Sequence, residues 1–190
     1  MDFIDLVVRN RCTRRFKQDQ TLDRETLLEL VNLARQTASG SNLQPLKYYL
    51  SWQPNQNEKI FPLVKWAGYL PDWQGPQEGE RPAAYIVILG DLSISASFAK
   101  DTGIAAQTIL LGAVERGYNG CMLGSFKDEK VREVLGLPDS LQTQLIVALG
   151  VSAEQAVLEE VGTDGSIRYW RDGNDVLHVP KRPLGAIVLT

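Results

Sequence analysis

The sequence is poor in the residues that build metal sites and disulfide frameworks. Its two cysteines, Cys12 and Cys121, lie far apart and in no C-x-x-C arrangement, and His178 is its single histidine. This scarcity argues against a zinc cluster, a disulfide-stabilised scaffold and a Ser-His-Asp hydrolase. We interpret Cys12 as a small buried thiol and His178 as a surface or hydrogen-bonded structural residue.

Long apolar runs and a strong excess of one charge are also missing. The longest apolar run, Ala83–Leu89, is far shorter than the roughly 18 residues that a membrane span needs. The N-terminus carries Asp2 and Asp5 where a signal peptide has basic residues, so we expect a cytoplasmic protein with no membrane contact. The net charge of −3 gives no bulk attraction for nucleic acid, so any anion site must be local.

The common nucleotide and catalytic motifs are absent as well. There is no G-x-G-x-x-G, no G-x-x-x-x-G-K-[ST], no G-x-S-x-G and no conspicuous carboxylate pair. An enzyme with so few candidate nucleophiles and bases is more plausibly one whose cofactor carries the reaction. We therefore name no catalytic side chain.

The 190 residues, 44% of them hydrophobic, fit a single domain spanning 1–190. Hydrophobic periodicity and turn residues predict helices over Asp2–Asn10, after Thr21, over Ser97–Arg116 and over Asp128–Leu135. Strands are predicted at Leu46–Trp52, Ala83–Gly90, Tyr118–Leu123 and Gln144–Val151. The pattern indicates an α+β fold with a mixed central sheet flanked by helices.

Two segments show little regular pattern. We expect Pro54–Pro82 to be an irregular active-site or interface loop, in which Trp66, Tyr69 and Trp73 form pocket walls or interface packing. The tail from Ser152 is patternless until the apolar run Ala186–Leu189, which is a candidate strand for a partner's sheet.

Four short segments carry the residue types that bind a flat, phosphorylated ligand. A basic turn gathers Arg9, Arg11, Arg14, Arg15 and Lys17, and guanidinium groups bind phosphate bidentately. Ser39–Pro45 offers hydroxyls, a glycine and two amides, which donate and accept at a ring edge. Gly120–Phe126 ends in small residues, and Val179–Pro183 holds Lys181 and Arg182 between prolines. Taken alone, each segment is more readily explained as a solvated turn or an ordinary loop.

In order and spacing these four segments resemble the nitroreductase family. The family has R-x-S-x-R-x-F, P-S-x-x-N-x-Q-P and glycine-rich segments, followed by a C-terminal basic residue. They correspond here to Asn10–Phe16, Ala38–Pro45, Cys121–Phe126 and Lys181-Arg182. The sequence departs from this pattern at Cys12, which replaces a serine, at Ala38, which replaces a proline, and at Leu46, which replaces a tryptophan.

The resemblance implies an FMN site at the interface of an intertwined homodimer whose C-terminal tail wraps the partner. Arg11 and Cys12 would contact the phosphate and ribityl chain, and Arg14 the N1–C2 carbonyl edge, where a cation stabilises the reduced flavin. Lys181 and Arg182 would complete the phosphate clamp. The remaining implied contacts are Ser39, Gly40, Ser41, Asn42 and Gln44 from the second subunit, and Met122, Leu123, Gly124 and Ser125 on the other face of the ring.

The implied reaction is ping-pong transfer from NAD(P)H, through flavin N5, to a small aromatic acceptor such as a nitroaromatic or a quinone. Alternatives on the same fold are a reductive dehalogenase-like or flavin-fragmenting enzyme, and a flavin-storage or sensing protein. A third alternative takes Arg9–Lys17 as a nucleic-acid contact, although no nucleic-acid motif accompanies it.

Overall fold

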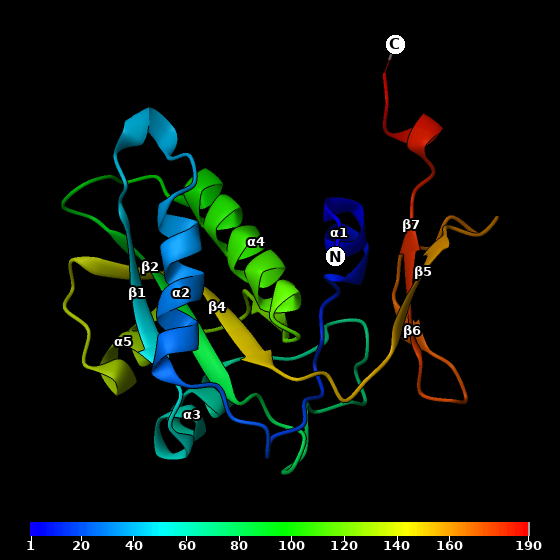
Figure 1. Ribbon diagram of the computed structural model, residues 1–190, viewed down its shortest axis with the longest axis horizontal. Coiled ribbons are helices and arrows are strands. Elements are labelled where there is room, and N and C mark those ends of the chain that lie inside the picture. The colour runs from blue at the N-terminus through cyan, green and yellow to red at the C-terminus, as the bar shows by residue number, and fades with distance from the viewer. Residues whose placement is uncertain (190) are drawn as a thin grey trace.

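The computed structural model, which describes residues 1–189, has an antiparallel sheet at its centre with helices on both faces (Figure 1). The strand order is β1-β2-β4-β3. Its strands are β1 (Leu46–Ser51), β2 (Ala84–Asp91), β3 (Asn119–Leu123) and β4 (Leu141–Gly150). The helices are α1 (Phe3–Arg9), α2 (Arg24–Arg35), α3 (Pro54–Ile60), α4 (Ala99–Glu115) and α5 (Asp128–Leu135).

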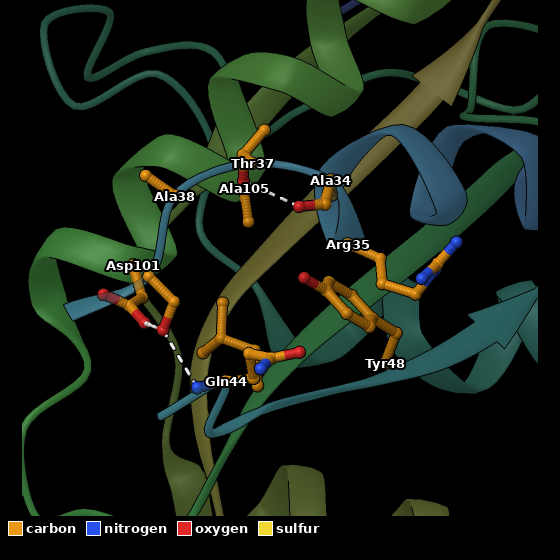
Figure 2. A pocket seen from close by; sticks show the side chains of 10 residues that line it. Ala34, Arg35, Thr37, Ala38, Gln44, Tyr48, Asp101 and Ala105 are labelled. Carbon is orange, nitrogen blue, oxygen red and sulfur yellow. Dashed lines mark hydrogen bonds between the residues drawn. The ribbon is translucent and has the colours of Figure 1, made fainter. Parts of the chain in front are cut away.

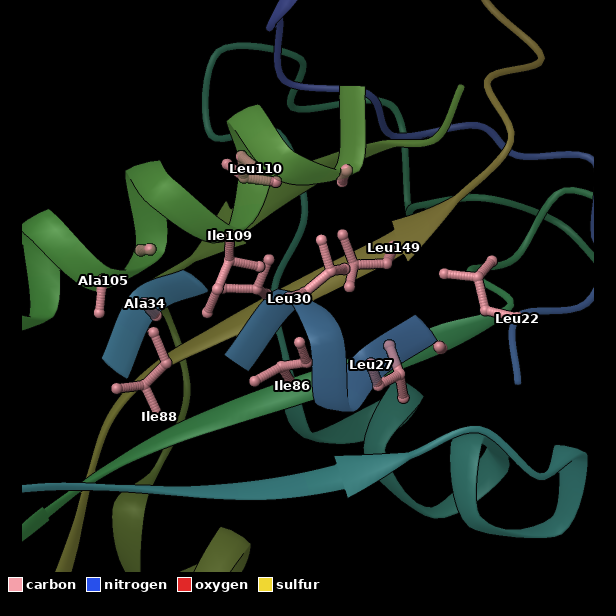
Figure 3. Packing of buried hydrophobic residues seen from close by; sticks show 14 of the residues in the cluster. Leu22, Leu27, Leu30, Ala34, Ile86, Ile88, Ala105, Ile109, Leu110 and Leu149 are labelled. Carbon is pink, nitrogen blue, oxygen red and sulfur yellow. The ribbon is translucent and has the colours of Figure 1, made fainter. Parts of the chain in front are cut away.

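Strand β2 is buried on both faces, which explains its continuous apolar sequence. Successive side chains of a strand point to opposite faces, so Ile86 and Ile88 pack under α2 and α4 while Tyr85 and Val87 pack on the α3 and α5 side. Figure 3 shows the first of these two clusters, with Leu30 of α2 and Ile109 of α4 meeting over the sheet.

A second, smaller sheet forms in the tail. It contains β5 (Ala156–Glu160), β7 (Leu177–Lys181) and β6 (Trp170–Arg171), in the order β5-β7-β6. The pair β5–β7 is parallel and the pair β6–β7 is antiparallel. In Figure 1 this sheet lies beside α1, apart from the four-stranded sheet, and the C-terminal segment projects away from it.

The predicted α+β fold is confirmed, and each predicted helix and strand is present within a few residues of its expected bounds. The strand directions refine the expected mixed sheet: the four-stranded sheet is antiparallel throughout, and the parallel pair lies in the tail sheet. No helix among residues 1–189 is both long enough and apolar enough to cross a membrane.

Two segments that were expected to be irregular contain regular structure. The segment Pro54–Pro82 begins with helix α3 and a 3-10 turn at Phe61–Leu63, because Pro54 occupies the first helical turn, where its missing N–H costs nothing. The tail contains the β5-β7-β6 sheet. The run Ala186–Leu189 forms the end of a 3-10 turn and then coil, with Leu189 97% exposed; its pairing with a partner stays a prediction.

Candidate functional site

The N-terminal basic turn is fixed to the edge of the central sheet. The N–H of Thr13 donates to the carbonyl of Gly120 at 3.0 Å, and Cys12 forms an isolated parallel bridge with the same glycine. A Cβ atom on Gly120 would lie 2.4 Å from the carbonyl oxygen of Ala148, so only glycine fits there. Phe16, fully buried, closes the turn against Gly150.

A buried carboxylate from the tail holds the backbone of the same turn. Glu154 accepts the main-chain N–H groups of Arg14 and Arg15 and forms an ion pair with Arg171. Arg15 also pairs with Asp175 and with Glu80. The arginines of this region therefore differ in their partners. Acidic side chains neutralise Arg15 of the basic turn and Arg171 of the tail, whereas no ion pair within residues 1–189 neutralises Arg14.

Beside this turn is a cavity of about 320 Å³. Its lining consists of Asn10, Arg11, Cys12, Arg14, Gln107, Leu110, Met122, Tyr169, Leu177, Val179 and Lys181. Three of these side chains are cationic and none is acidic, so the cavity is suited to an anionic ligand with an apolar part.

The three cations differ in their surroundings. Arg14 is buried, and its guanidinium lies 4.6 Å from the ring centroid of Tyr169. Arg11 donates to the carbonyl of Val7 at 2.6 Å, and its buried Nε has no hydrogen-bond partner among residues 1–189. Burial lowers the pKa of Arg11. Lys181 is exposed at the end of β7. Unpaired cationic donors at a cavity are what a phosphorylated ligand requires.

Cys12 and Cys121 form a neighbouring thiol pair, in which Cys121 is buried and Cys12 is exposed. The expectation that Cys12 is buried was wrong, because its side chain lines the open cavity. A hydrogen bond from the Cys121 thiol, together with the nearby Arg14 charge, lowers the pKa of the Cys12 thiol to about 6. The same hydrogen bond and burial raise the pKa of Cys121. Cys12 is thus the more readily deprotonated of the two thiols.

The Met122–Ser125 segment divides between two surfaces. Met122 faces the cavity, whereas Leu123, which points to the opposite face of β3, is buried in the core on the α5 side. Gly124 is exposed directly after the strand, and the nearest atom to an added Cβ would be 3.8 Å away. Ser125 accepts the N–H of Lys65 at 2.9 Å and lines a separate pocket of about 560 Å³.

The Ser39–Gln44 loop lies at the N-terminal end of α4, away from the cavity. Asp101 accepts the hydroxyl of Ser39 and the N–H of Gly40, and the Ser39 hydroxyl accepts the N–H of Gln44. Figure 2 shows Asp101, Gln44 and Tyr48 around a small pocket of about 70 Å³ beneath this loop.

The backbone of this loop is strained. Ser41, Asn42 and Gln44 have φ values of 50°, 55° and 52°, in the left-handed region that residues with a side chain rarely adopt. All three are exposed. Strain of this kind at an exposed surface is typical of ligand or partner contacts.

The structure thus brings Arg11, Cys12, Arg14, Met122 and Lys181 together around one cavity. It places the Ser39–Gln44 loop, Leu123, Gly124 and Ser125 outside the lining of that cavity, and Arg182 is exposed one residue beyond Lys181. Sequence reasoning missed Glu154, Asp101 and Tyr169, because nothing in their local sequence connects them to the basic turn. Among residues 1–189 no group of three or more His, Cys, Asp or Glu side chains is arranged to hold a metal ion.

Comparison with known proteins places the sequence and the fold among the nitroreductases. The sequence profile of the nitroreductase family matches residues 7–151. A nitroreductase family protein from Streptococcus pneumoniae has a similar structure, with a TM-score of 0.73, 17% identity and full coverage of both chains. An FMN-dependent nitroreductase from Clostridium difficile has a TM-score of 0.68 and 21% identity, over 80% of this chain and 89% of that chain. A family protein from Clostridium novyi has a TM-score of 0.65 and 24% identity, over 80% and 87%.

Proposed function

Because the chain belongs to the nitroreductase family, we propose that it is an FMN-dependent oxidoreductase. It takes electrons from NAD(P)H and passes them to a small aromatic acceptor, a nitroaromatic or a quinone. The observation that carries this proposal is the buried Arg14 guanidinium, which has no acidic partner within residues 1–189 and lies on a cavity whose lining is cationic and otherwise largely apolar.

The residues of the cavity fit FMN. The unpartnered Nε of Arg11 and the exposed Lys181 are suited to a phosphate, and Leu110, Met122 and Val179 offer apolar surface for a ring. Bound FMN would supply reversible acceptance of a hydride, which suits the alternating reduction and oxidation of a ping-pong cycle. Gly124 lies outside this lining, and the open space beside it after β3 supports its proposed place near the ring.

The chain's own contribution is to bind, orient and stabilise charge. Arg14 places a fixed cation in a partly desolvated position, where it favours a ligand that gains negative charge on reduction. Asn10 and Gln107 offer amides that can donate or accept at the same cavity. We assign no protein acid or base.

We further propose that the working unit is a homodimer in which the Ser39–Gln44 loop of one protomer completes the cavity of the other. The strained, exposed loop supports this, because it lies away from the cavity of its own chain. Helix α1 has no buried residue, with Phe3 69% and Ile4 73% exposed, and Leu184 in the tail is 73% exposed. Apolar surface of this kind needs a partner.

An anaerobic titration tests the function. The protein loaded with FMN should bleach on addition of NADPH or NADH, and an added quinone or nitroaromatic should restore the absorbance. Arg14→Gln should weaken FMN binding at least tenfold, while Arg24→Gln, at an exposed α2 arginine paired with Glu25, should leave it unchanged. A protein that binds FMN but is reduced by neither nucleotide would be a storage or sensing protein instead. Sedimentation of the holoprotein tests the dimer.

A further inference from the structure

Arg14 is held by an aromatic ring, and this differs chemically from being held by a carboxylate. A carboxylate partner would occupy two guanidinium N–H donors and cancel the charge. A ring beneath the guanidinium attracts the cation through its π face and leaves the N–H donors free. Among residues 1–189 the contact that the Arg14 side chain makes of either kind is with Tyr169, at 4.6 Å.

Tyr169 is itself held in place by Tyr69. The ring of Tyr69 lies 5.0 Å from the Tyr169 ring, tilted by 49°, and the Tyr169 hydroxyl accepts the main-chain N–H of Tyr69 at 3.2 Å. The Arg168 guanidinium then lies 5.2 Å from the Tyr69 ring. The Tyr169 ring therefore contacts both Tyr69 and Arg14, and it lines the cavity with Arg14.

We propose that Tyr169 is the positioning residue for Arg14. It orients the guanidinium toward the cavity while leaving its charge and its donors available to the bound ligand. The inference rests on the proposed FMN function, in which Arg14 stabilises the negative charge of the reduced flavin. Tyr169 acts on the ligand through Arg14, and its hydroxyl accepts the main-chain N–H of Tyr69.

The consequence is a difference between the two redox states of the ligand. Loss of the ring releases the Arg14 side chain, so reduced FMN, which is anionic, should lose more affinity than oxidised FMN. We expect Tyr169→Met, which keeps apolar volume without a π face, to lower the ratio of the two affinities about tenfold. This tenfold change corresponds to a fall of about 30 mV in the two-electron midpoint potential of the bound flavin. Tyr169→Phe keeps the π face, so its potential should fall by much less than that of Tyr169→Met.

A double-mutant cycle tests whether the effect passes through Arg14. The FMN dissociation constant and the flavin midpoint potential are measured for wild type, Tyr169→Met, Arg14→Gln and the double variant. Arg14→Gln should weaken binding further than Tyr169→Met does, and the double variant should match Arg14→Gln alone. Tyr169→Leu replaces Tyr169→Met if the methionine variant fails to reach the wild-type melting temperature.

Each outcome decides the question. Equal effects of Tyr169→Met in the wild-type and Arg14→Gln backgrounds overturn the inference and leave the proposed function standing, because FMN still binds. A potential that falls as far in Tyr169→Phe as in Tyr169→Met also overturns it, since the hydroxyl and not the ring would then be responsible. A wild-type protein that does not bind FMN at all overturns the proposed function together with the inference.

Discussion

The carboxylate of Glu154 accepts the main-chain N–H of Arg14, a residue 140 positions earlier in the sequence. The Glu154 side chain is only 2% exposed, and it also pairs with Arg171 in the tail. One buried acid thereby joins the N-terminal turn, which lines the cavity, to the tail sheet, whose strand β7 supplies Lys181. The cavity depends on this connection, because its cationic residues come from both ends of the chain.

Glu154→Gln should therefore destabilise the fold markedly. The amide keeps the shape but leaves the Arg171 guanidinium, 12% exposed, without its buried partner, so we expect the free energy of unfolding to fall by about 3 kcal/mol. Chemical denaturation measures this. Asp175→Asn is the matched control, because Asp175 pairs with Arg171 from a position that is 52% exposed; it should cost less than about 1 kcal/mol. Equal losses in the two variants would contradict the role assigned to Glu154.

Two glycines near the cavity should respond differently to the same added methyl group. In Gly120→Ala the new Cβ meets a backbone oxygen at 2.4 Å, so we expect a loss of stability of about 2 kcal/mol or more. In Gly124→Ala the nearest atom is 3.8 Å away, so the stability should be unchanged and only the FMN affinity should fall. Thermal melting and FMN titration of both variants check this; a Gly124→Ala protein that binds FMN like wild type would remove Gly124 from the site.

Cys12 should be reactive at unusually low pH. Its lowered pKa of about 6 predicts that the rate of alkylation by iodoacetamide rises to its half-maximum near pH 6, whereas an ordinary thiol does so near about 8.5. Cys121, 2% exposed, should stay unmodified in the folded protein. Mass spectrometry of the labelled peptide, with Cys12→Ser as the control, makes the measurement. A half-maximum at pH 8 or above would show that the neighbouring thiol does not stabilise the thiolate.

Protonated His178 should stabilise the tail sheet, and this stabilisation should be lost in alkaline solution. Its Nδ1 lies 2.9 Å from a carboxylate oxygen of Glu159, and its ring stacks on Trp170 at 4.2 Å. The hydrogen bond to Glu159 raises the pKa of His178 above its ordinary value of about 6.5. The resulting stabilisation is complete below that ordinary value and is lost as the pH rises through the higher folded-state pKa.

The single histidine makes this measurable by proton NMR, since only one imidazole titrates. Denaturation of wild type and His178→Gln at pH 6 and pH 9 should give a larger stability difference at pH 6. A histidine that titrates below about 6.5 would contradict the assigned ion pair with Glu159.

Local sequence patterns predicted the core of the fold well. Strand β2 has an unbroken apolar run. Helix α5 has acids in its first turn and Gly136 in the left-handed conformation at its end. Both elements can therefore be predicted from residues that are neighbours in the sequence. The tail sheet was missed because its pairing is non-local: Val157 of β5 pairs with His178 of β7, and neither strand alternates cleanly between apolar and polar residues.

The site was predictable only in part, for a similar reason. The basic turn was visible as a cluster of arginines, but the sequence does not show which of them an acid neutralises. That division depends on Glu154 and Asp175 in the tail, and the orientation of Arg14 depends on Tyr169. Such contacts follow from tertiary packing, which periodicity and composition do not encode.

Helix α4 carries Asp101, which holds the strained loop, and Leu110, which lines the cavity, nine residues further on; at 1.5 Å per residue they are about 14 Å apart along the axis. In the proposed dimer, each cavity is completed by the loop of the other chain. An alteration in the cavity and an alteration in the loop can therefore complement each other when they lie on different chains. A chain altered at Arg14 and a chain altered at Asn42 would each be inactive alone. If the two chains are mixed and re-paired at random, about a quarter of all sites should be intact. Half of the dimers are then mixed, and each mixed dimer has one undamaged site out of two.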